Sequence, residues 1–455
     1  MKDFKKLTSL LILAIMVISC ASGRADPPQL FTASLQLPST ETATLKPPPS
    51  GHQSPTLTTA PTAKITADPA TPTSISRTAT IAARSIDPTA EDTPIVLIGT
   101  VIDGTGAELL KGSAIVIQDG YISSLGLSPD VDIPSEATII ELQDATILPG
   151  FINSHVHNAY IPALLEKWAQ AGVTTVRDVG AKFPFSNFHA SDKFNTDPHL
   201  ATVVSAGPLI TTPGGYPIVG SDFPSLAVTN PEHARREVTQ LISDGADVIK
   251  IVIVSDVGLP TLSLDMASAI VETAHQRGVP VTAHVNSLND LKRALAAGVD
   301  DIAHIVAQER VPVEVLEQMV ANDVYWVPTL EPFGGHDGGN LRAFLALGGN
   351  VALGNDGGML PGIEIGMPMQ EIEMMQAAGM SPMEIILAAT RNAAHVCNLE
   401  DLLGTLEAGK IADILVVNGN PLDDLHALME VRLVIHQGVI IRDSGEARPE
   451  GLPPK

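Results

Sequence analysis

Short apolar runs alternate with longer amphipathic stretches between about residues 146 and 357, and several runs begin just after a glycine. Gly172, Gly245 and Gly298 each stand where a helical pattern ends, which is typical of a helix C-terminus that needs a positive φ. Alternating strands and helices predict a parallel sheet with right-handed crossovers, and eight runs favour a TIM-like (β/α)8 barrel of the α/β class. The candidate strands are residues 146–154, 173–176, 201–205, 247–254, 279–284, 301–305, 324–330 and 350–354.

Shorter strand patterns flank this region on both sides. Residues 94–145 contain apolar runs broken by Asp-Gly pairs at 103–104 and 119–120, which favour hairpin turns. A similar pattern returns at residues 405–445. We therefore expect a small β-sandwich domain assembled from both flanks, beside a barrel at residues 146–404.

The N-terminal residues 1–20 have the layout of a secretory signal peptide. Lysines precede an apolar stretch that is short for a transmembrane helix, and Cys20 follows a small residue, which resembles a bacterial lipobox. We expect lipid on Cys20 and an extracytoplasmic chain anchored to a bacterial membrane. An ordinary signal peptide and an uncleaved anchor are the alternatives. The Pro- and Thr-rich residues 21–93 predict a disordered tether.

Charge and cysteine content narrow the classes of partner. The formal net charge of −24 argues against a nucleic acid partner, because phosphate binding needs clustered Lys and Arg. If Cys20 is lipidated, Cys397 has no intramolecular disulfide partner, so stability must come from the core. The sequence leaves a homo-oligomer open.

Two histidines end the first candidate strand. His155 and His157 are two residues apart, so in an extended strand both imidazoles face one side and can bind one metal ion. The alternative is a pair of histidines in a polar loop. The metal-binding interpretation of this pair depends on the polar residues found at the ends of other strands.

Lys250 interrupts the apolar run at residues 248–253. Buried lysines are rare, and full burial lowers their pKa by up to about 3–5 units. A neutral amine can add carbon dioxide to form a carbamate, whose two oxygens would bridge two cations. The alternative is a lysine at a strand end that reaches solvent or pairs with a carboxylate.

Three later strands end in His284, His304 and Asp356. The carboxyl ends of barrel strands meet at one end of the barrel, so we expect these side chains to join the other three in a two-metal site. Asp356 could bind metal and accept the proton of a water. The alternatives are core histidines satisfied by hydrogen bonds and, for Asp356, an Asp-Gly turn with Gly357.

Four segments give the chain a specific resemblance to the amidohydrolase superfamily, in its imidazolonepropionase-like and lysine-carboxylated prolidase-like branch. They are PGFINSHVH at residues 149–157, GVTTVRD at 172–178, ATRNAA at 389–394 and GTLEAGKIAD at 404–413. The resemblance covers roughly residue 95 to the C-terminus.

This resemblance implies a role for each of the six residues. His155, His157 and Asp356 would hold one metal ion and His284 and His304 a second, with carboxylated Lys250 bridging two divalent ions, by default zinc. It implies a hydrolase that cleaves a peptide-like or cyclic amide of a small-molecule substrate with a metal-bridging hydroxide. Asp356 and His304 would be the catalytic residues, with Asp356 passing the water proton to the leaving nitrogen.

Departures from the family pattern fall where substrate would bind. Tyr216 follows Gly214-Gly215 where many relatives have a histidine, and residues 359–369 lack a histidine-glycine pair often found there. Tyr216, Arg177 and His336 are therefore candidates for substrate contact. Their alternatives are loop packing for Tyr216, an ion pair for Arg177 and solvent exposure for His336.

Competing functions remain open at this point. A mononuclear deaminase of the superfamily is disfavoured, because the glutamate expected soon after His284 is absent and Lys250 would have no purpose. A lactonase-like hydrolase would use the same site. A non-catalytic surface lipoprotein that keeps the barrel as a scaffold is the alternative from another class.

Overall fold

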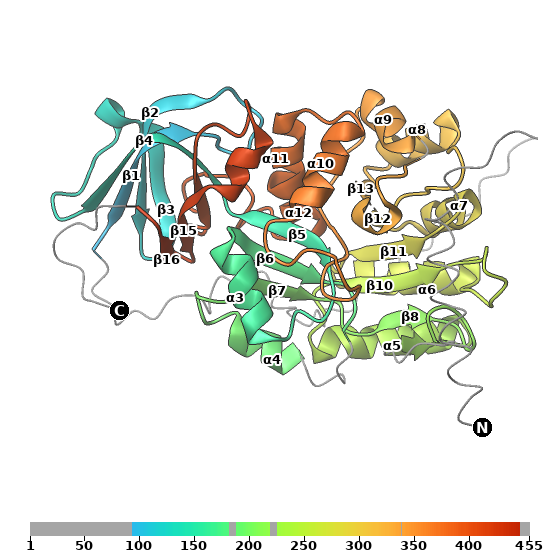
Figure 1. The fold of residues 1–455 in the computed structure, drawn as a ribbon. Helices are drawn as coiled ribbons and strands as arrows, with labels where there is room; N and C mark the ends of the chain where they lie inside the picture. The colour runs from blue at the N-terminus through green and yellow to red at the C-terminus, as the bar shows by residue number, and fades with distance from the viewer. Residues whose placement is uncertain (1–92, 182–187, 219–224, 338, 446–455) are drawn as a thin grey trace, which may run out of the picture. The chain divides into compact units, whose positions relative to one another are not determined.

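The computed structural model describes residues 93–181, 188–218, 225–337 and 339–445 (Figure 1). The predicted signal peptide at residues 1–20, with Cys20, lies outside these residues, as does the predicted tether at 21–93 apart from Thr93. Within the described ranges, no helix combines the length and the apolar character that crossing a bilayer would require.

Seven strands from both ends of the described chain form one sheet. They are β1 (Ile95–Val101), β2 (Leu110–Gln118), β3 (Tyr121–Leu127), β4 (Thr138–Pro149), β14 (Ile414–Asn418), β15 (Val431–His436) and β16 (Val439–Asp443). Their order is β16-β15-β14-β4-β1-β2-β3, and β14 runs antiparallel to β4, with Leu415 opposite Leu148 (Figure 1). The two flanks therefore pair, but the described strands lie in a single sheet, so the predicted sandwich of two sheets is not confirmed.

Parallel strands make up the α/β part of the chain. They are β5 (Phe151–Val156), β6 (Val173–Asp178), β7 (Thr202–Ser205), β8 (Leu209–Thr211), β9 (Ser225–Ala227), β10 (Ile249–Ile253), β11 (Val281–Val285), β12 (Asp301–Ala303) and β13 (Tyr325–Val327). They form two sheets, in the orders β5-β6-β7 and β13-β12-β11-β10-β8-β9. The run predicted as one strand at residues 146–154 is divided, because residues 146–149 belong to β4 and the first strand of this part begins at Phe151.

Backbone hydrogen bonds link these two sheets at two places. The N–H of Asp247, just before β10, donates to the carbonyl of Ser205 in β7 at 2.8 Å. On the other side, Val351 forms a parallel bridge with Trp326 of β13, and Gly357 forms one with Val156 of β5. Residues 351–357 thus occupy the gap between β13 and β5. The arrangement is a TIM-barrel-like α/β fold, although the described strands are not paired throughout as one closed ring.

Helices connect most of these parallel strands. They are α3 (Pro162–Gln170), α4 (Phe188–Phe194), α5 (Pro231–Asp244), α6 (Leu264–His275), α7 (Leu288–Ala297), α8 (Val313–Ala321), α9 (Asn340–Ala346), α10 (Met369–Ala377), α11 (Pro382–Ala389) and α12 (Arg391–Val396). The predicted stop at Gly245 is confirmed, because this residue caps α5 with φ 118°. Gly298 caps α7 in the same way with φ 86°, and only residues 299 and 300 separate it from β12.

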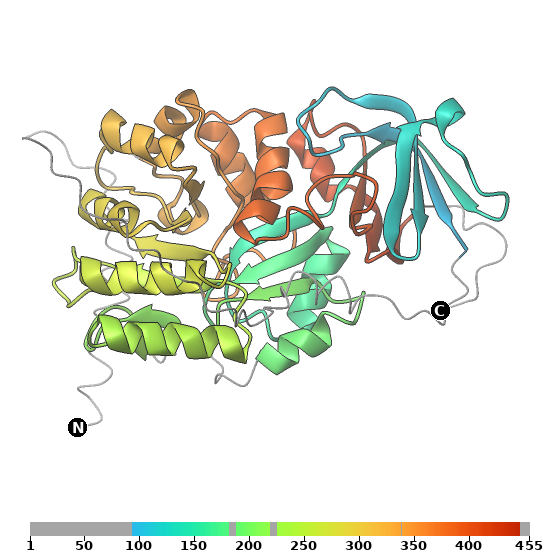
Figure 2. The same ribbon diagram turned by 180° about the vertical axis from the view of Figure 1, so that it is seen from behind.

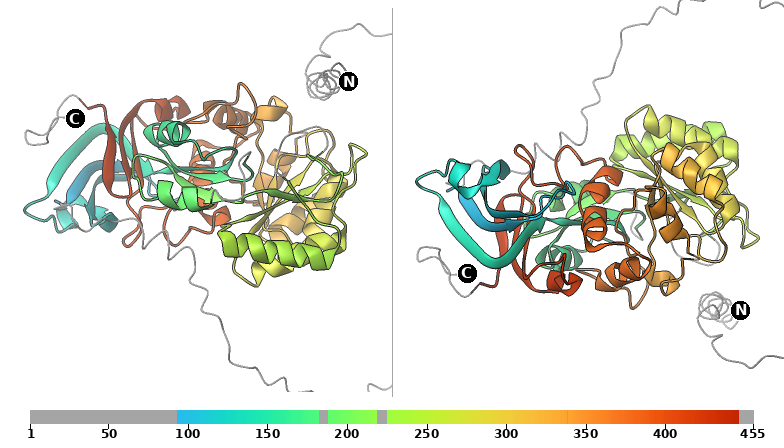
Figure 3. Two further views of the ribbon diagram at one scale, coloured as in Figure 1. Left: turned by 90° about the horizontal axis from the view of Figure 1, so that it is seen from below. Right: turned by 90° about the horizontal axis from the view of Figure 1, so that it is seen from above.

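The helices cover the outer side of the parallel strands. Figure 2 shows α5 and α6 side by side in front of β10 and β11, and both views of Figure 3 show α5 to α8 outside the strands. Side chains of β10 and β11 such as Ile249, Ile251 and Val281 are fully buried in the core shared with these helices. Packing on this side leaves the carboxyl ends of the strands available for polar residues.

Candidate functional site

Six sequence-predicted residues lie within or just beyond parallel strands of the α/β part. His155 lies in β5, Lys250 in β10 and His284 in β11. His157 and His304 directly follow β5 and β12, and Asp356 directly precedes the bridge residue Gly357. Parallel strands bring such positions to one end of a sheet. Five of the six are buried and His284 is partly buried, so the sequence places polar side chains where water is largely excluded.

Asp356 and the two N-terminal histidines form one compact group. Oδ1 of Asp356 lies 2.9 Å from Nε2 of His157 and 3.4 Å from Nε2 of His155. One ligand atom from each of the three residues lies within 4.8 Å of the other two, a spacing that can hold a metal ion. The predicted convergence of these three residues is therefore present in the geometry.

The other two histidines adjoin this group. The ring centroids of His284 and His304 are 4.2 Å apart, and those of His304 and His155 are 4.7 Å apart. His304 thus touches both sets of imidazoles. The five side chains named so far form one continuous polar cluster rather than two separate sites.

Hydrogen bonds engage one defined nitrogen on each of three rings and so fix the orientation of the ring. Nδ1 of His157 donates to the carbonyl of Gly180 at 2.6 Å, and Nδ1 of His304 shares a hydrogen bond with Oγ1 of Thr329 at 2.7 Å. On His284 the bonded nitrogen is Nε2, which lies 3.1 Å from Oδ1 of Asn286. Partners of this kind orient ligating imidazoles, so Nε2 of His157 and His304 and Nδ1 of His284 are the nitrogens available for metal.

Lys250 is buried without a hydrogen-bond partner. Its side chain is 1% exposed, and among the described residues its Nζ makes no hydrogen bond. Burial, together with the positive charge of Arg177, lowers the pKa of Lys250 to about 7, although the negative charges of Asp301 and Asp356 oppose the shift. An amine with this pKa is substantially neutral at neutral pH, which is the form that a carbamate requires.

Burial also keeps three of the imidazoles neutral. It lowers the pKa of His284 to about 3, and it lowers the pKa of His155 and His304 well below the ordinary value. Neutral imidazole is the form that binds metal. Burial opposes protonation of His157 as well, but the adjacent carboxylate of Asp356 outweighs it and raises the pKa of His157.

The backbone is strained at two of the six positions. His304 has φ 71° and Asp356 has φ 61°, in the left-handed region that residues other than glycine rarely adopt. Asp356 is held there by its N–H bond to the carbonyl of His155, at 2.9 Å, and His304 by its N–H bond to the carbonyl of Val327, also at 2.9 Å. Strain of this kind clusters at functional sites, where the surrounding structure compensates for its cost.

The three predicted substrate contacts have different outcomes. Tyr216 lies beside the cluster, with its ring centroid 5.4 Å from that of His284. Arg177 is fully buried and its guanidinium binds both carboxylate oxygens of Asp301, at 2.8 and 2.9 Å. The ion pair named as the alternative for Arg177 is therefore what the fold contains. His336 is exposed, as its alternative stated, and makes no side-chain contact with the site among the described interactions.

Several polar residues around the cluster were not singled out from the sequence. Thr329 and Glu331 follow β13, and Asn355 directly precedes Asp356. Their positions at or just after the end of a predicted strand were the available signal, but their partners come from distant segments. Asn355, for example, accepts a hydrogen bond from Nδ2 of Asn153 and donates one to Glu331.

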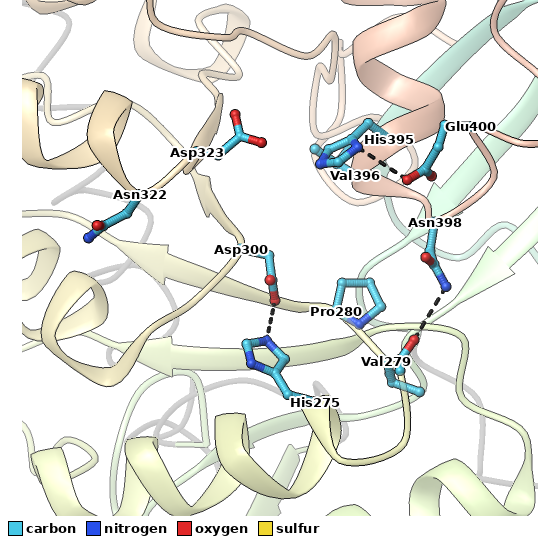
Figure 4. Close-up of a pocket in the computed structure, with 11 residues that line it drawn as sticks. His275, Val279, Pro280, Asp300, Asn322, Asp323, His395, Val396, Asn398 and Glu400 are labelled. Atoms are coloured by element: carbon cyan, nitrogen blue, oxygen red, sulfur yellow. Dashed lines mark hydrogen bonds and ion pairs between the residues drawn. The ribbon is translucent and has the colours of Figure 1, made fainter.

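A separate cavity of about 360 Å³ lies at the opposite ends of the strands (Figure 4). Asp300 and Asp323, which precede β12 and β13, line it, and it contains two imidazole–carboxylate pairs: His275 with Asp300 at 2.8 Å, and His395 with Glu400 at 3.3 Å. Its position at the amino ends of the strands separates it from the histidine cluster.

Comparison with known proteins identifies the family. Residues 146–441 match the model of the Amidohydrolase family. Ochratoxinase from Aspergillus niger is 26% identical over 420 residues, covering 75% of this chain and 84% of the relative. Among solved structures, a Xaa-Pro dipeptidase with bound methionine is 27% identical with a TM-score of 0.67, covering 76% of this chain and 99% of the other. A putative prolidase from Bifidobacterium longum is 28% identical with a TM-score of 0.66, covering 78% and 96%.

The matched residues include all six members of the predicted site and the strands that carry them. The family match therefore agrees with the resemblance read from the sequence motifs. The chain belongs to the amidohydrolase family and is a hydrolase that acts on carbon–nitrogen bonds.

Proposed function

We propose that this chain is a binuclear metal-dependent hydrolase that cleaves an amide bond in a small molecule. His155, His157 and Asp356 would hold one divalent ion, and His284 and His304 the other, with a carbamate on Lys250 as the bridge. The observation that carries this proposal is the buried donor cluster next to an unpartnered lysine amine. In the absence of a ligand, such groups are costly to bury.

The donor set fits zinc. Neutral imidazole nitrogens and a carboxylate are the ligands zinc prefers, and hydrogen bonds at Nδ1 of His157 and of His304 orient two of the imidazole rings. When bound, the ions supply a nucleophile active at neutral pH and polarise the scissile carbonyl. Asp356 accepts a proton at its carboxylate and delivers it to the leaving nitrogen. His304, packed between the two groups of ligands, completes the proposed catalytic pair.

The proposed fold is a closed barrel at residues 146–404, beside a small β-domain from residues 94–145 and 405–445. Hydrogen bonds from Asp247 to Ser205, and bridges at Val351 and Gly357, support closure at the two gaps between the sheets. Closure would fix the distances among ligands drawn from different strands. We further propose that lipid on Cys20 anchors this body outside the cytoplasm, at the end of the tether.

Peptide-like and cyclic amides are the proposed substrates. Two of the similar proteins support amide cleavage as the reaction class: one is named an ochratoxinase and the other a Xaa-Pro dipeptidase. Lactones are the second candidate, because ester and amide carbonyls need the same activation. A scaffold without catalysis is disfavoured, since all six donor residues are present.

The experiment that tests the proposal is the metal-to-protein ratio of the purified full chain, prepared with zinc and bicarbonate. We expect about two ions per chain, followed by amide hydrolysis in a screen of dipeptides and cyclic amides. A ratio of one would support a mononuclear site and leave Lys250 structural. A metal-free protein would move the scaffold alternative to the front.

A further inference from the structure

Glu371 has a fully buried carboxyl group that binds backbone N–H groups rather than a cation. It lies on α10 with no exposed surface, and its two oxygens accept the N–H groups of Leu330 and Glu331, at 2.8 and 2.7 Å. Within the described residues, no ion pair includes Glu371. Burying a charge-bearing group is costly unless its bonds are used. The bonds of Glu371 fix one turn, residues 329–331, which follows β13.

One end of this turn reaches the histidine cluster. Thr329 shares a hydrogen bond between its Oγ1 and Nδ1 of His304 at 2.7 Å. Thr329 itself has φ 46°, a left-handed conformation that a β-branched residue adopts only when its surroundings hold it there. The N–H bonds to Glu371 begin at the next residue, so they hold the backbone that keeps Thr329 in place.

The other end of the turn reaches the segment that carries Asp356. The carboxylate of Glu331 accepts from Nδ2 of Asn355 at 3.1 Å and from the N–H of Glu364 at 3.3 Å. Oδ1 of Asn355 in turn accepts from Nδ2 of Asn153, at 2.8 Å, and from the N–H of Gly357, at 3.2 Å. All of these groups except Glu364 are buried, so water does not compete for them. The residue between Asn355 and Gly357 is Asp356.

We propose that Glu371 is a positioning residue of the metal centre, which orients His304 through Thr329 and Asp356 through Glu331 and Asn355. This inference rests on the proposed function, because it assigns a common support to ligands of two different ions. Because Glu371 supports both routes, one substitution at this position should disturb His304 and Asp356 together. Groups that orient metal ligands typically change metal affinity about 10–100-fold when they are replaced.

The Glu371→Gln variant tests this arrangement with little change in shape. A glutamine amide offers one acceptor oxygen, so one of the two turn N–H groups would face an NH2 group instead. Glu373→Gln is the matched control, because Glu373 lies on the same helix but is half exposed and pairs with His426 on the surface. Both variants are prepared as the full chain, and metal binding is measured with Co²⁺ alone.

Two readouts separate positioning from general stability. The first is the Co²⁺ dissociation constant, which we expect to rise about 10–100-fold in Glu371→Gln and to stay unchanged in Glu373→Gln. The second is the visible absorption spectrum of the Co²⁺-loaded protein, which reports ligand geometry and should shift only in Glu371→Gln. A spectrum and an affinity equal to those of the native chain would overturn the inference.

Further variants keep the test decisive if Glu371→Gln does not fold. Thr329→Val removes the hydroxyl that meets His304, whereas Thr329→Ser keeps it and should restore the native Co²⁺ spectrum. Glu331→Gln tests the other branch. Native spectra in both Thr329→Val and Glu331→Gln would reject the proposed routes. Failure of the native chain to bind Co²⁺ would instead contradict the proposed function itself, so the two failures are distinguishable.

Discussion

Oδ1 of Asp356 lies 2.9 Å from Nε2 of His157, and backbone bonds flank this contact on both sides. The N–H of Asp356 donates to the carbonyl of His155 at 2.9 Å, and the N–H of His157 donates to the carbonyl of Gly357 at 2.8 Å. The carboxylate is thus fixed to the strand that carries two of its partners. A group held this firmly can receive and release a proton without a large movement.

Asp356→Asn should leave the fold intact and remove most activity. The amide keeps the size of the carboxylate and one oxygen for a metal ion, but it cannot accept the proton. We expect metal to be retained and kcat to fall about 10²–10⁴-fold. Metal analysis and steady-state kinetics on the best amide substrate check this, with the exposed Asp265→Asn on α6 as control. A near-normal kcat in Asp356→Asn would remove the proton-transfer role.

Lys250→Ala should lose metal because it removes the proposed bridge. Its small side chain leaves space beside the ligands, and a short carboxylic acid such as acetate can fill that space with two oxygens. We therefore expect the variant to bind less metal than the native chain and to recover metal when acetate is added. Metal analysis with increasing acetate gives the answer. Full metal content without acetate would show that Lys250 is not a bridge.

Lys250 should also make the stability of the metal-free protein depend on pH. Burial lowers the pKa of Lys250 from 10.5 to about 7 in the folded chain. Between these values the unfolded chain holds a proton that the folded chain has lost, so the free energy of unfolding rises as pH increases through this range. Below about pH 7 the full cost of the buried charge remains.

Lys250→Met removes this cost without opening a large cavity. Relative to the native chain, the metal-free variant should be more stable by roughly 1–3 kcal/mol near pH 7, since it lacks an unsatisfied buried donor. The difference should shrink as the pH approaches 10.5, because the cost of burying the charge is lost and only that of the unpaired neutral amine remains. Urea unfolding in chelator at three pH values measures it, and Lys292→Met, at an exposed position on α7, is the control. A pH-independent difference would contradict the assignment.

Arg177 and Asp301 should matter for stability rather than for substrate. Arg177 donates to both oxygens of Asp301, and it also donates to the carbonyls of Ser154 and Val396. Asp301→Asn leaves this buried guanidinium without its countercharge, which typically costs about 3–5 kcal/mol. Arg235→Met, which breaks an exposed pair with Glu272, should cost less than about 1 kcal/mol. Denaturant unfolding measures the loss of stability in the two variants. Equal losses would contradict the prediction that breaking the buried pair costs more than breaking the exposed pair.

The convergence of the histidines and Asp356 could be predicted from the sequence, because each of these residues lies at or near the end of a strand. His155, His284 and Asp356 each end an apolar run, and parallel strands bring such ends together whatever the details of packing. Gly245 and Gly298 were equally predictable, since a helix stop requires a positive φ that glycine adopts without strain.

The supporting contacts could not be predicted in this way. The hydrogen bond between Asn153 and Asn355 joins residues 202 positions apart, and no periodic pattern of apolar residues predicts such a contact. Arg177 shows the same limit, because its partner Asp301 lies on another strand, 124 positions further along the chain. The boundary between β4 and β5 was also missed. The apolar run at residues 146–154 gives no sign that Gly150 divides it between two sheets.

Tyr216 should contribute its ring to substrate binding. The ring lies 5.4 Å from His284, and burial together with the charge of Asp356 raises the pKa of its hydroxyl, so the phenol stays protonated at neutral pH. Tyr216→Ala removes an apolar wall worth about 1–3 kcal/mol, so KM should rise about 10–100-fold with metal content unchanged. Tyr216→Phe keeps that wall and should keep a near-native KM. Equal increases in KM in both variants would show that the hydroxyl, rather than the ring, meets the substrate, whereas a native KM in Tyr216→Ala would place the substrate elsewhere in the site.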